Sequence, residues 1–383
     1  GELSQKLTGK PAVLIDQNGA PAGEKNIIFY NPPVVNRQLG IRRSCLLEAK
    51  NIALNFLKNH IQTITFARSR LAVEVLLTYL QEDMKKEPGA IDRIKGYRGG
   101  YLPRERREIE KGLRDGKILG VVSTNALELG IDIGNLDASI ITGYPGSIAS
   151  TWQQAGRAGR RNSVSASILV ASSSPLDQFI VNHPQYFFKA SPEHGLINPN
   201  NLYILVSHIK CAAFELPFSD GETFGDERID EILAFLEDEG ILRHVGGRWH
   251  WMAESFPAEE ISLRSASTEN FVVIDITEGA KVIGEVDRSS APMMIHEEAI
   301  YIHAGQQYQV EKLDYEEKKA YVRKVDVDYY TDANVAVEIK VLDVFREKTV
   351  ESCQNYLGEV MVTSLATMFK KVKFFTHENL GFG

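Results

Sequence analysis

The chain has 383 residues, enough for two or three domains, which excludes a single small module. Hydrophobic residues make up 43% and charged residues 25%, a globular balance that excludes a disordered tail. No run approaches the roughly 20 apolar residues that span a bilayer, and the N-terminal GELSQKLTGK lacks the apolar core of a signal peptide. We therefore expect a cytosolic protein with no membrane partner.

The three cysteines are Cys45, Cys211 and Cys353, and none forms a CxxC pair. Such spacing argues against a disulfide framework and against a cysteine-built zinc site. We predict no metal site in this chain.

Charge divides the chain into two parts. Residues 1–175 hold 24 Lys and Arg against 16 Asp and Glu, a net of +8, whereas residues 176–383 hold 19 against 35, a net of −16. A basic part suits a phosphate-binding surface, although basic clusters are also common on plain solvated faces. We expect the acidic part to dock another protein domain rather than to wrap nucleic acid.

The first part alternates short apolar runs with segments of helical period. The runs that we expect to be buried strands are IIFY at 27–30, TITFA at 63–67, ILGVVS at 118–123, ASIIT at 138–142 and ASILVAS at 166–172. Helices are expected over 70–86 and after Pro103. This alternation predicts an α/β domain with a parallel sheet, whose ligands bind beyond the carboxyl ends of the strands.

The pattern changes beyond Pro175. A helix over 202–214, a second helix near 229–236 and a hairpin about Gly246-Gly247 are typical of a winged helix, or of a small α+β packing module without ligands. The segments that follow are strand-rich and predict a small antiparallel β-barrel or sandwich. The expected divisions are a tail at 1–26, an α/β domain at 27–175, a winged-helix-like module at 176–257, a β domain at 258–345 and a further unit beginning at 346–383.

Residues 123–134, STNALELGIDIG, follow one predicted strand. Ser123 and Thr124 would place hydroxyl and N–H groups where a phosphate could bind, or would simply cap a short helix. Gly130 and Asp132 would place a carboxylate in a tight turn, where it could accept a hydrogen bond from a ribose hydroxyl or an arginine.

A second segment, QQAGRAGRR, contains Arg157 and Arg160 three positions apart. On a helix these side chains project from one face, and two guanidinium groups so placed can clamp a phosphate. Gln153 lies one turn earlier, and Gly156 leaves that face open to a ligand. A helix stabilised only by salt bridges would not require two Gly-Arg pairs together with a glutamine.

These segments together resemble a known family. TITFARSR, YRGGYLPRERREIEKGLRDG, STNALELGIDIG and QQAGRAGRR resemble motif IV, the Arg-Gly-Gly-Tyr box, motif V and motif VI of superfamily-2 DNA helicases. NIIFYNPP, GYLPRERREIE and NALELGIDIG more narrowly resemble the bacterial YprA/MrfA helicases and their RecQ-like eukaryotic relatives, which are associated with DNA repair. The resemblance is specific over about residues 24–175 and implies the second RecA-like motor domain.

The resemblance implies a division of roles. ATP with Mg²⁺ would bind between two RecA-like domains, with Arg157 and Arg160 as arginine fingers, Gln153 as γ-phosphate sensor, and Asp132, Gly130 and Gly156 near the nucleotide. The residues that match a single-strand DNA track are Ser69, Arg70, Arg98, Gly99 and Thr124. It further implies 3′ to 5′ unwinding of single-stranded or partly duplex DNA in a bacterial, nucleoid-associated enzyme.

The sequence also departs from the family. It holds no GxxxxGK[ST] loop and no DExH box, so we expect that the first RecA-like domain belongs to a longer parent chain and supplies the Mg²⁺ ligands. We predict that the 383 residues alone do not hydrolyse ATP. The alternatives are an RNA helicase, a translocase that does not unwind, and a non-catalytic nucleic-acid-binding or protein-docking module on a motor scaffold.

Overall fold

The computed structural model describes two compact units. One comprises residues 19–193 with 270–383, and the other comprises residues 1–18 with 194–269. The described residues are 1–15, 17, 19, 23–134, 136–159, 164–195, 197, 200–225, 227–261 and 269–383. Across these ranges, no helix combines the length and apolar character that crossing a bilayer requires.

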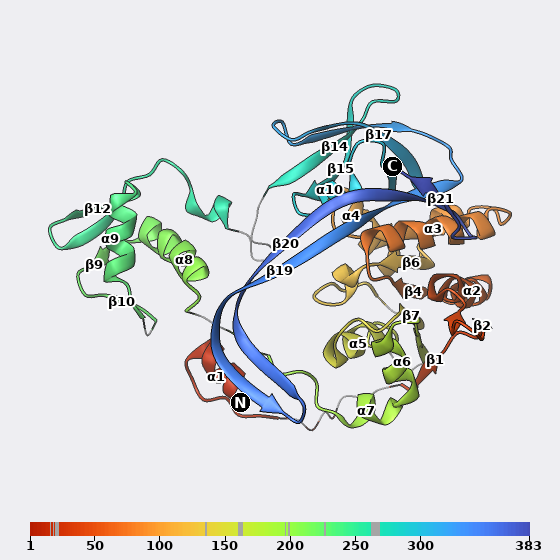
Figure 1. Ribbon diagram of the computed structural model, residues 1–383, viewed down its shortest axis with the longest axis horizontal. Coiled ribbons are helices and arrows are strands. Elements are labelled where there is room, and N and C mark those ends of the chain that lie inside the picture. Colours follow the sequence, from red (N-terminus) through yellow and green to blue (C-terminus); the bar gives the residue numbers. More distant parts are fainter. Residues whose placement is uncertain are drawn as a thin grey trace. The chain divides into compact units, whose positions relative to one another are not determined.

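A six-stranded parallel sheet forms the centre of the larger unit, in the order β1-β8-β7-β4-β6-β5 (Figure 1). Its strands are β1 (Lys25–Tyr30), β4 (Thr63–Phe66), β5 (Ile94–Tyr97), β6 (Gly120–Ser123), β7 (Ala138–Thr142) and β8 (Ser165–Val170). The sheet confirms the predicted α/β class. Strand β5 was not predicted, because IKGY is short and contains both a charge and a glycine.

Helices cover both faces of this sheet. On one face lie α2 (Cys45–Lys58) and α3 (Arg70–Met84), and on the other lie α4 (Pro103–Arg114) and α5 (Ile148–Ala155). The alternation of side chains along a strand explains the two cores: Ile140 packs with α2 and α3, whereas Ile141 packs with α4 and α5. Smaller elements are β2 (Val34–Asn36), β3 (Ile41–Arg42), η1 (Ile91–Arg93) and η2 (Asn125–Leu127).

The boundary expected at residue 175 is too early. Helices α6 (Pro175–Asn182) and α7 (Pro184–Lys189) pack on the motor domain, since Ile180 joins its core and Phe187 contacts the ring of Phe29. The SSSP segment at 172–175 suggested a joint, but Pro175 begins a helix here. The motor portion therefore runs to Glu193.

A small β domain belongs to the same unit. Its strands are β14 (Asn270–Asp275), β15 (Lys281–Asp287), β16 (Ile300–His303), β17 (Gln306–Asp314) and β18 (Lys319–Lys324), with helix α10 (Ala291–Met294). They form one sheet in the order β15-β14-β18-β17-β16, antiparallel except for the parallel pair β14–β18.

The last part of the chain forms a long ribbon. Strands β19 (Tyr329–Val350) and β20 (Cys353–Lys373) pair antiparallel over their length, and β21 (Asn379–Phe382) pairs with the end of β20 (Figure 1, blue). The expected boundary at residue 345 therefore falls inside a strand. Residues 346–383 do not begin a separate unit, because residues 358–373 pair with residues 329–344 in the same ribbon.

The smaller unit has the winged-helix arrangement that the sequence predicted. It contains α8 (Leu202–Glu215), α9 (Asp230–Asp238), and a sheet of β12 (Leu242–Val245), β13 (Arg248–Trp251) and β9 (Phe218–Ser219). Both glycines of the Gly246-Gly247 turn have positive φ, as a tight two-residue hairpin requires. The remaining elements are α1 (Glu2–Thr8), β10 (Thr223–Phe224), β11 (Glu227–Arg228) and η3 (Pro257–Glu260).

The expected tail at 1–26 is split between the two units, since residues 1–18 belong to the smaller unit and β1 of the larger unit begins at Lys25.

Candidate nucleic-acid and nucleotide site

The carboxyl edge of the parallel sheet gathers most of the predicted track residues. Ser69 and Arg70 follow β4, Gly99 follows β5, and Thr124 follows β6. Because β4, β6 and β5 are neighbours in the sheet, segments far apart in the sequence meet at one edge. This is the edge where parallel α/β sheets bind ligands.

Ser69 and Arg70 begin helix α3. The Ser69 hydroxyl caps the helix by accepting the N–H of Ala72 at 3.1 Å. Arg70 forms an ion pair with Asp287 of the β domain at 3.4 Å, and both side chains are about three-tenths exposed. The β domain therefore contributes a carboxylate to this edge, which sequence reasoning did not reveal.

Arg98 has a different environment from the one expected. Its side chain is 0% exposed; Nε donates to the Glu74 carboxylate at 2.7 Å and Nη2 donates to the Ile302 carbonyl at 3.1 Å. A guanidinium without exposed surface cannot bind a nucleic-acid phosphate, so the expectation that this side chain lines the track is wrong. Arg98 instead joins the motor domain to the β domain. The Glu74 carboxylate also accepts the Tyr101 hydroxyl and the N–H of Gly305.

The motif V segment leaves the sheet in a short helical turn. Ser123 is buried, and the Thr124 hydroxyl accepts the N–H of Ala126 at 3.4 Å as the cap of η2. The capping alternative raised for Thr124 is thus observed. The Asp132 carboxylate accepts the N–H of Gly134 at 3.1 Å, which closes the turn, and Gly130 has a φ of 82° in open surroundings.

Motif VI begins on helix α5 and continues beyond it. Gln153 lies on the helix and is exposed, and Gly156 forms the C-cap. The helix ends at Ala155, and Gly159 has a φ of 82°. Arg157 therefore lies beyond the end of the helix and does not project from the helical face that the sequence predicted. Arg160 lies outside the described residues.

Arg157 is 95% buried and bonded to the motif V loop. Its Nε and Nη2 donate to the Glu128 carbonyl at 2.9 and 2.6 Å, and its Nη1 donates to the Ile131 carbonyl at 2.6 Å. These bonds satisfy main-chain acceptors that a turn leaves unpaired. Arg157 therefore fixes the position of one motif relative to the other.

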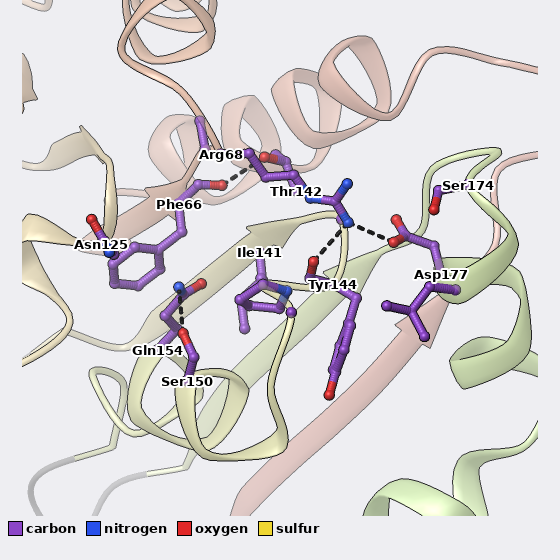
Figure 2. A pocket seen from close by; sticks show the side chains of 15 residues that line it. Phe66, Arg68, Asn125, Ile141, Thr142, Tyr144, Ser150, Gln154, Ser174 and Asp177 are labelled. Atoms are coloured by element: carbon purple, nitrogen blue, oxygen red, sulfur yellow. Dashed lines mark hydrogen bonds and ion pairs between the residues drawn. The ribbon is translucent and has the colours of Figure 1, made fainter. Parts of the chain in front are cut away.

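A cavity of about 430 Å³ opens beside these motifs (Figure 2). It is lined by Phe66, Ala67, Arg68, Asn125, Ile141, Thr142, Gly143, Tyr144, Pro145, Gly146, Ser150, Gln154, Ser174, Leu176 and Asp177. Arg68 donates to the buried Asp177 carboxylate at 2.5 Å and to the Tyr144 carbonyl at 2.6 Å. Burial raises the pKa of Tyr144 to about 12, which keeps its hydroxyl neutral.

Sequence reasoning missed Arg68 and Gln154 in this cavity. Arg68 lies directly before the matched Ser69, and Gln154 directly follows Gln153, so adjacency in the motif was the available signal. Gln154 is 95% buried and donates to the Glu128 carboxylate at 2.9 Å, whereas its carbonyl Oε1 has no partner among the described atoms.

The N-terminus of α5 holds a carboxylate from the chain itself. Glu193 accepts the N–H groups of Ile148 and Ala149 at 2.6 and 3.0 Å. These backbone hydrogen bonds lower the pKa of Glu193, because they stabilise its charged form. Glu193 is the last residue of the motor portion, so the segment leading to the winged-helix unit is tied to the motif VI helix.

Comparison with protein families places two domains on this chain. The helicase conserved C-terminal domain matches residues 48–162, and the winged-helix domain of the ATP-dependent helicase HRQ1 matches residues 197–266. The first match contains the motif V and motif VI segments just described. The second begins eight residues after the end of α7 at Lys189.

Whole-chain relatives decide the family. An ATP-dependent helicase of Bacillus subtilis, YprA, is 59% identical over 100% of this chain and 51% of its own length. Over its whole length the chain matches a C-terminal portion of the YprA/MrfA-like superfamily-2 helicases. HRQ1 of Saccharomyces cerevisiae is 34% identical over 94% of this chain and 34% of its own length.

Solved structures agree with this match. The crystal structure of the helicase MrfA bound to DNA matches 100% of this chain and 51% of that chain, at 58% identity and a TM-score of 0.84. A second MrfA structure, bound to DNA and AMPPNP, matches with the same TM-score at 57% identity. The chain thus spans about half the length of the YprA/MrfA proteins that it matches.

Proposed function

We propose that the chain is the second-motor-domain portion of an ATP-dependent DNA helicase or translocase. The observation that carries this proposal is the bonding of Arg157 to the motif V loop beside the sheet edge where Ser69, Arg70 and Thr124 meet. A DNA-facing edge and a nucleotide-facing segment would then be rigidly connected. The relatives named as ATP-dependent helicases, and MrfA crystallised with DNA and with AMPPNP, support DNA and ATP as the ligands.

On the DNA side, the edge offers groups that bind phosphates without reading sequence. Arg70 supplies a guanidinium, Ser69 and Thr124 supply hydroxyls, and Gly99 allows close approach to the backbone. Arg68 adds a second, half-exposed guanidinium one residue before Ser69. Arg98 takes no part in this contact and instead holds the β domain in place.

On the nucleotide side, Gln153 and Arg160 are proposed to contact the terminal phosphate of ATP, with Asp132, Gly130 and Gly156 nearby. Arg157 acts in this proposal mainly by positioning the motif V loop. ATP would bind with Mg²⁺, whose ligands lie on a first RecA-like domain of the same parent polypeptide. The parent protein would unwind DNA with 3′ to 5′ polarity in repair, in the bacterial cytosol near the nucleoid.

The test is steady-state ATP hydrolysis by the full-length parent, with and without single-stranded DNA. Arg160→Ala should lower DNA-stimulated kcat by about 10³-fold or more, the usual worth of an arginine finger, while DNA binding survives. The matched control is Arg104→Ala, an exposed arginine on α4 that forms an ion pair with Glu108 of the same helix. If the parent does not hydrolyse ATP, or if Arg160→Ala leaves the rate of hydrolysis unchanged, a non-catalytic scaffold would be favoured instead. Stimulation by RNA but not by DNA would identify an RNA helicase.

A further inference from the structure

The β19–β20 ribbon has little support from the rest of the described structure. At its base, Thr331 and Phe369 are buried, and the Thr331 hydroxyl accepts the N–H of Ile300. Between Glu338 and Thr363, which face each other, the ribbon runs outward with every residue exposed. An isolated two-stranded ribbon is marginal in water, because neither face is covered.

The pairing register gives the ribbon one apolar face. Directly opposed residues of an antiparallel pair point to the same side of the sheet, and successive pairs alternate sides. The pairs on one side are Val335–Ala366, Val337–Ser364, Ile339–Val362 and Val341–Val360. The intervening pairs, on the opposite side, are Ala336–Leu365, Glu338–Thr363 and Lys340–Met361, and two of these three pairs contain a charged residue.

This apolar face is exposed rather than packed. Ile339 and Val341 are 64% and 61% exposed, and their respective partners Val362 and Val360 are 56% and 52% exposed. A contiguous row of aliphatic β-branched side chains on a soluble domain marks a surface that another protein segment covers. The four pairs on this face contain no charged residue, which does not suit DNA phosphates. The occupant that fits is an apolar protein surface.

We propose that a further segment of the same parent polypeptide, from outside these 383 residues, packs on the apolar face of the β19–β20 ribbon. Relatives that match the ribbon along its whole length carry about as much chain again, since this chain spans 51% of YprA and 51% of MrfA. MrfA also matches the whole of this chain, ribbon included. An uncharged aliphatic face suits a permanent intramolecular contact better than a transient one. The proposal rests on the match to these longer relatives and is independent of the helicase activity proposed above.

The register supplies a matched pair of variants. Val362→Lys places a charge on the apolar face, and Thr363→Lys places the same charge on the opposite face one residue away. Both replace a β-branched residue by lysine in the same strand, so their effects on strand propensity are similar. Each variant is made in the full-length parent and in the 383-residue chain, and amide hydrogen exchange is measured across β19 and β20.

In the parent, Val362→Lys should speed exchange of the ribbon about 10- to 100-fold, the factor that corresponds to losing the burial of one aliphatic side chain. Thr363→Lys should change it less than threefold. In the 383-residue chain, both variants should behave alike, because the covering segment is absent. Equal effects in the parent would overturn the proposal. An effect of Val362→Lys that is equally large in the 383-residue chain would also overturn it. The same holds if the effect depends on protein concentration, because that would indicate that a second copy of the chain covers the face.

Discussion

The main-chain carbonyl of Glu128 binds the Arg157 side chain, and the Glu128 carboxylate binds helix α5. The Glu128 carbonyl accepts Nε and Nη2 of Arg157, while its carboxylate accepts the Ser150 hydroxyl at 2.7 Å and the Gln154 amide at 2.9 Å. One residue of motif V thus contacts both the helix and the loop of motif VI. A displacement of either motif is passed to the other through this residue.

Removal of the Glu128 side chain should therefore uncouple the two motifs. Glu128→Ala leaves the 95% buried Gln154 amide with only the long 3.4 Å hydrogen bond to the Ser150 hydroxyl, which should cost about 1–3 kcal/mol of unfolding free energy. In the full-length parent, DNA-stimulated ATP hydrolysis should fall by about tenfold, because small displacements of catalytic groups are costly. Urea denaturation and steady-state kinetics measure the two effects. Glu108→Ala, on the exposed face of α4, is the control and should change neither; equal results for both variants would exclude a coupling role.

The buried ion pair between Arg98 and Glu74 makes a prediction about stability. Arg98→Ala should lower the unfolding free energy by about 3–5 kcal/mol, because it leaves the Glu74 carboxylate buried without its countercharge. The double variant Arg98→Met with Glu74→Leu should be less destabilised than either single change. Denaturant titration of Arg98→Ala, Arg98→Met, Glu74→Leu and the double variant measures these losses. A single-variant loss below about 1 kcal/mol would show that the pair is not buried in solution.

The sequence predicted the motifs better than it predicted where their side chains point. The parallel sheet and the winged helix were available from apolar runs and turn signals, and the assignment of Ser69, Arg70 and Thr124 to the DNA track came from the resemblance to helicase motifs. The burial of Arg98 was not, because it depends on Ile302 and Gly305 of the β domain, some 200 residues away. A motif match identifies a residue, but long-range packing determines whether its side chain is exposed to solvent.

The ribbon was missed for a related reason. Residues 346–383 lack the closely spaced turn signals that mark short hairpins, because each strand has more than 20 residues and one turn joins them. Register shifts near Val341 and Val344 also interrupt the alternation of apolar and polar residues. The periodicity of a single strand was therefore not enough to predict the ribbon, because its faces are defined by the pairing between the two strands.

Arg70 provides a test of the DNA-facing edge. Arg70→Ala should weaken binding of single-stranded DNA to the parent and reduce the slope of log affinity against log salt by roughly 1, because one phosphate contact is lost. Fluorescence anisotropy at several salt concentrations measures both quantities. Arg104→Ala, which removes an equal charge from the exposed face of α4, should leave the slope unchanged. An unchanged slope for Arg70→Ala would place the track elsewhere.

Glu193 gives the motif VI helix a pH-dependent anchor. Its pKa in the folded state is lowered by hydrogen bonds from Ile148 and Ala149, so the stability that it contributes is fully present above the ordinary glutamate value of 4.5. That contribution is lost as the pH falls through the lowered folded-state value. The Tm of Glu193→Gln should accordingly lie below that of the wild type above pH 5, and the two should converge as the solution is acidified further. Thermal melts between pH 3 and pH 7 measure the difference, with Glu108→Gln as the exposed control. A gap between Glu193→Gln and the wild type that stays constant down to pH 3 would show that the carboxylate charge is not what holds this helix.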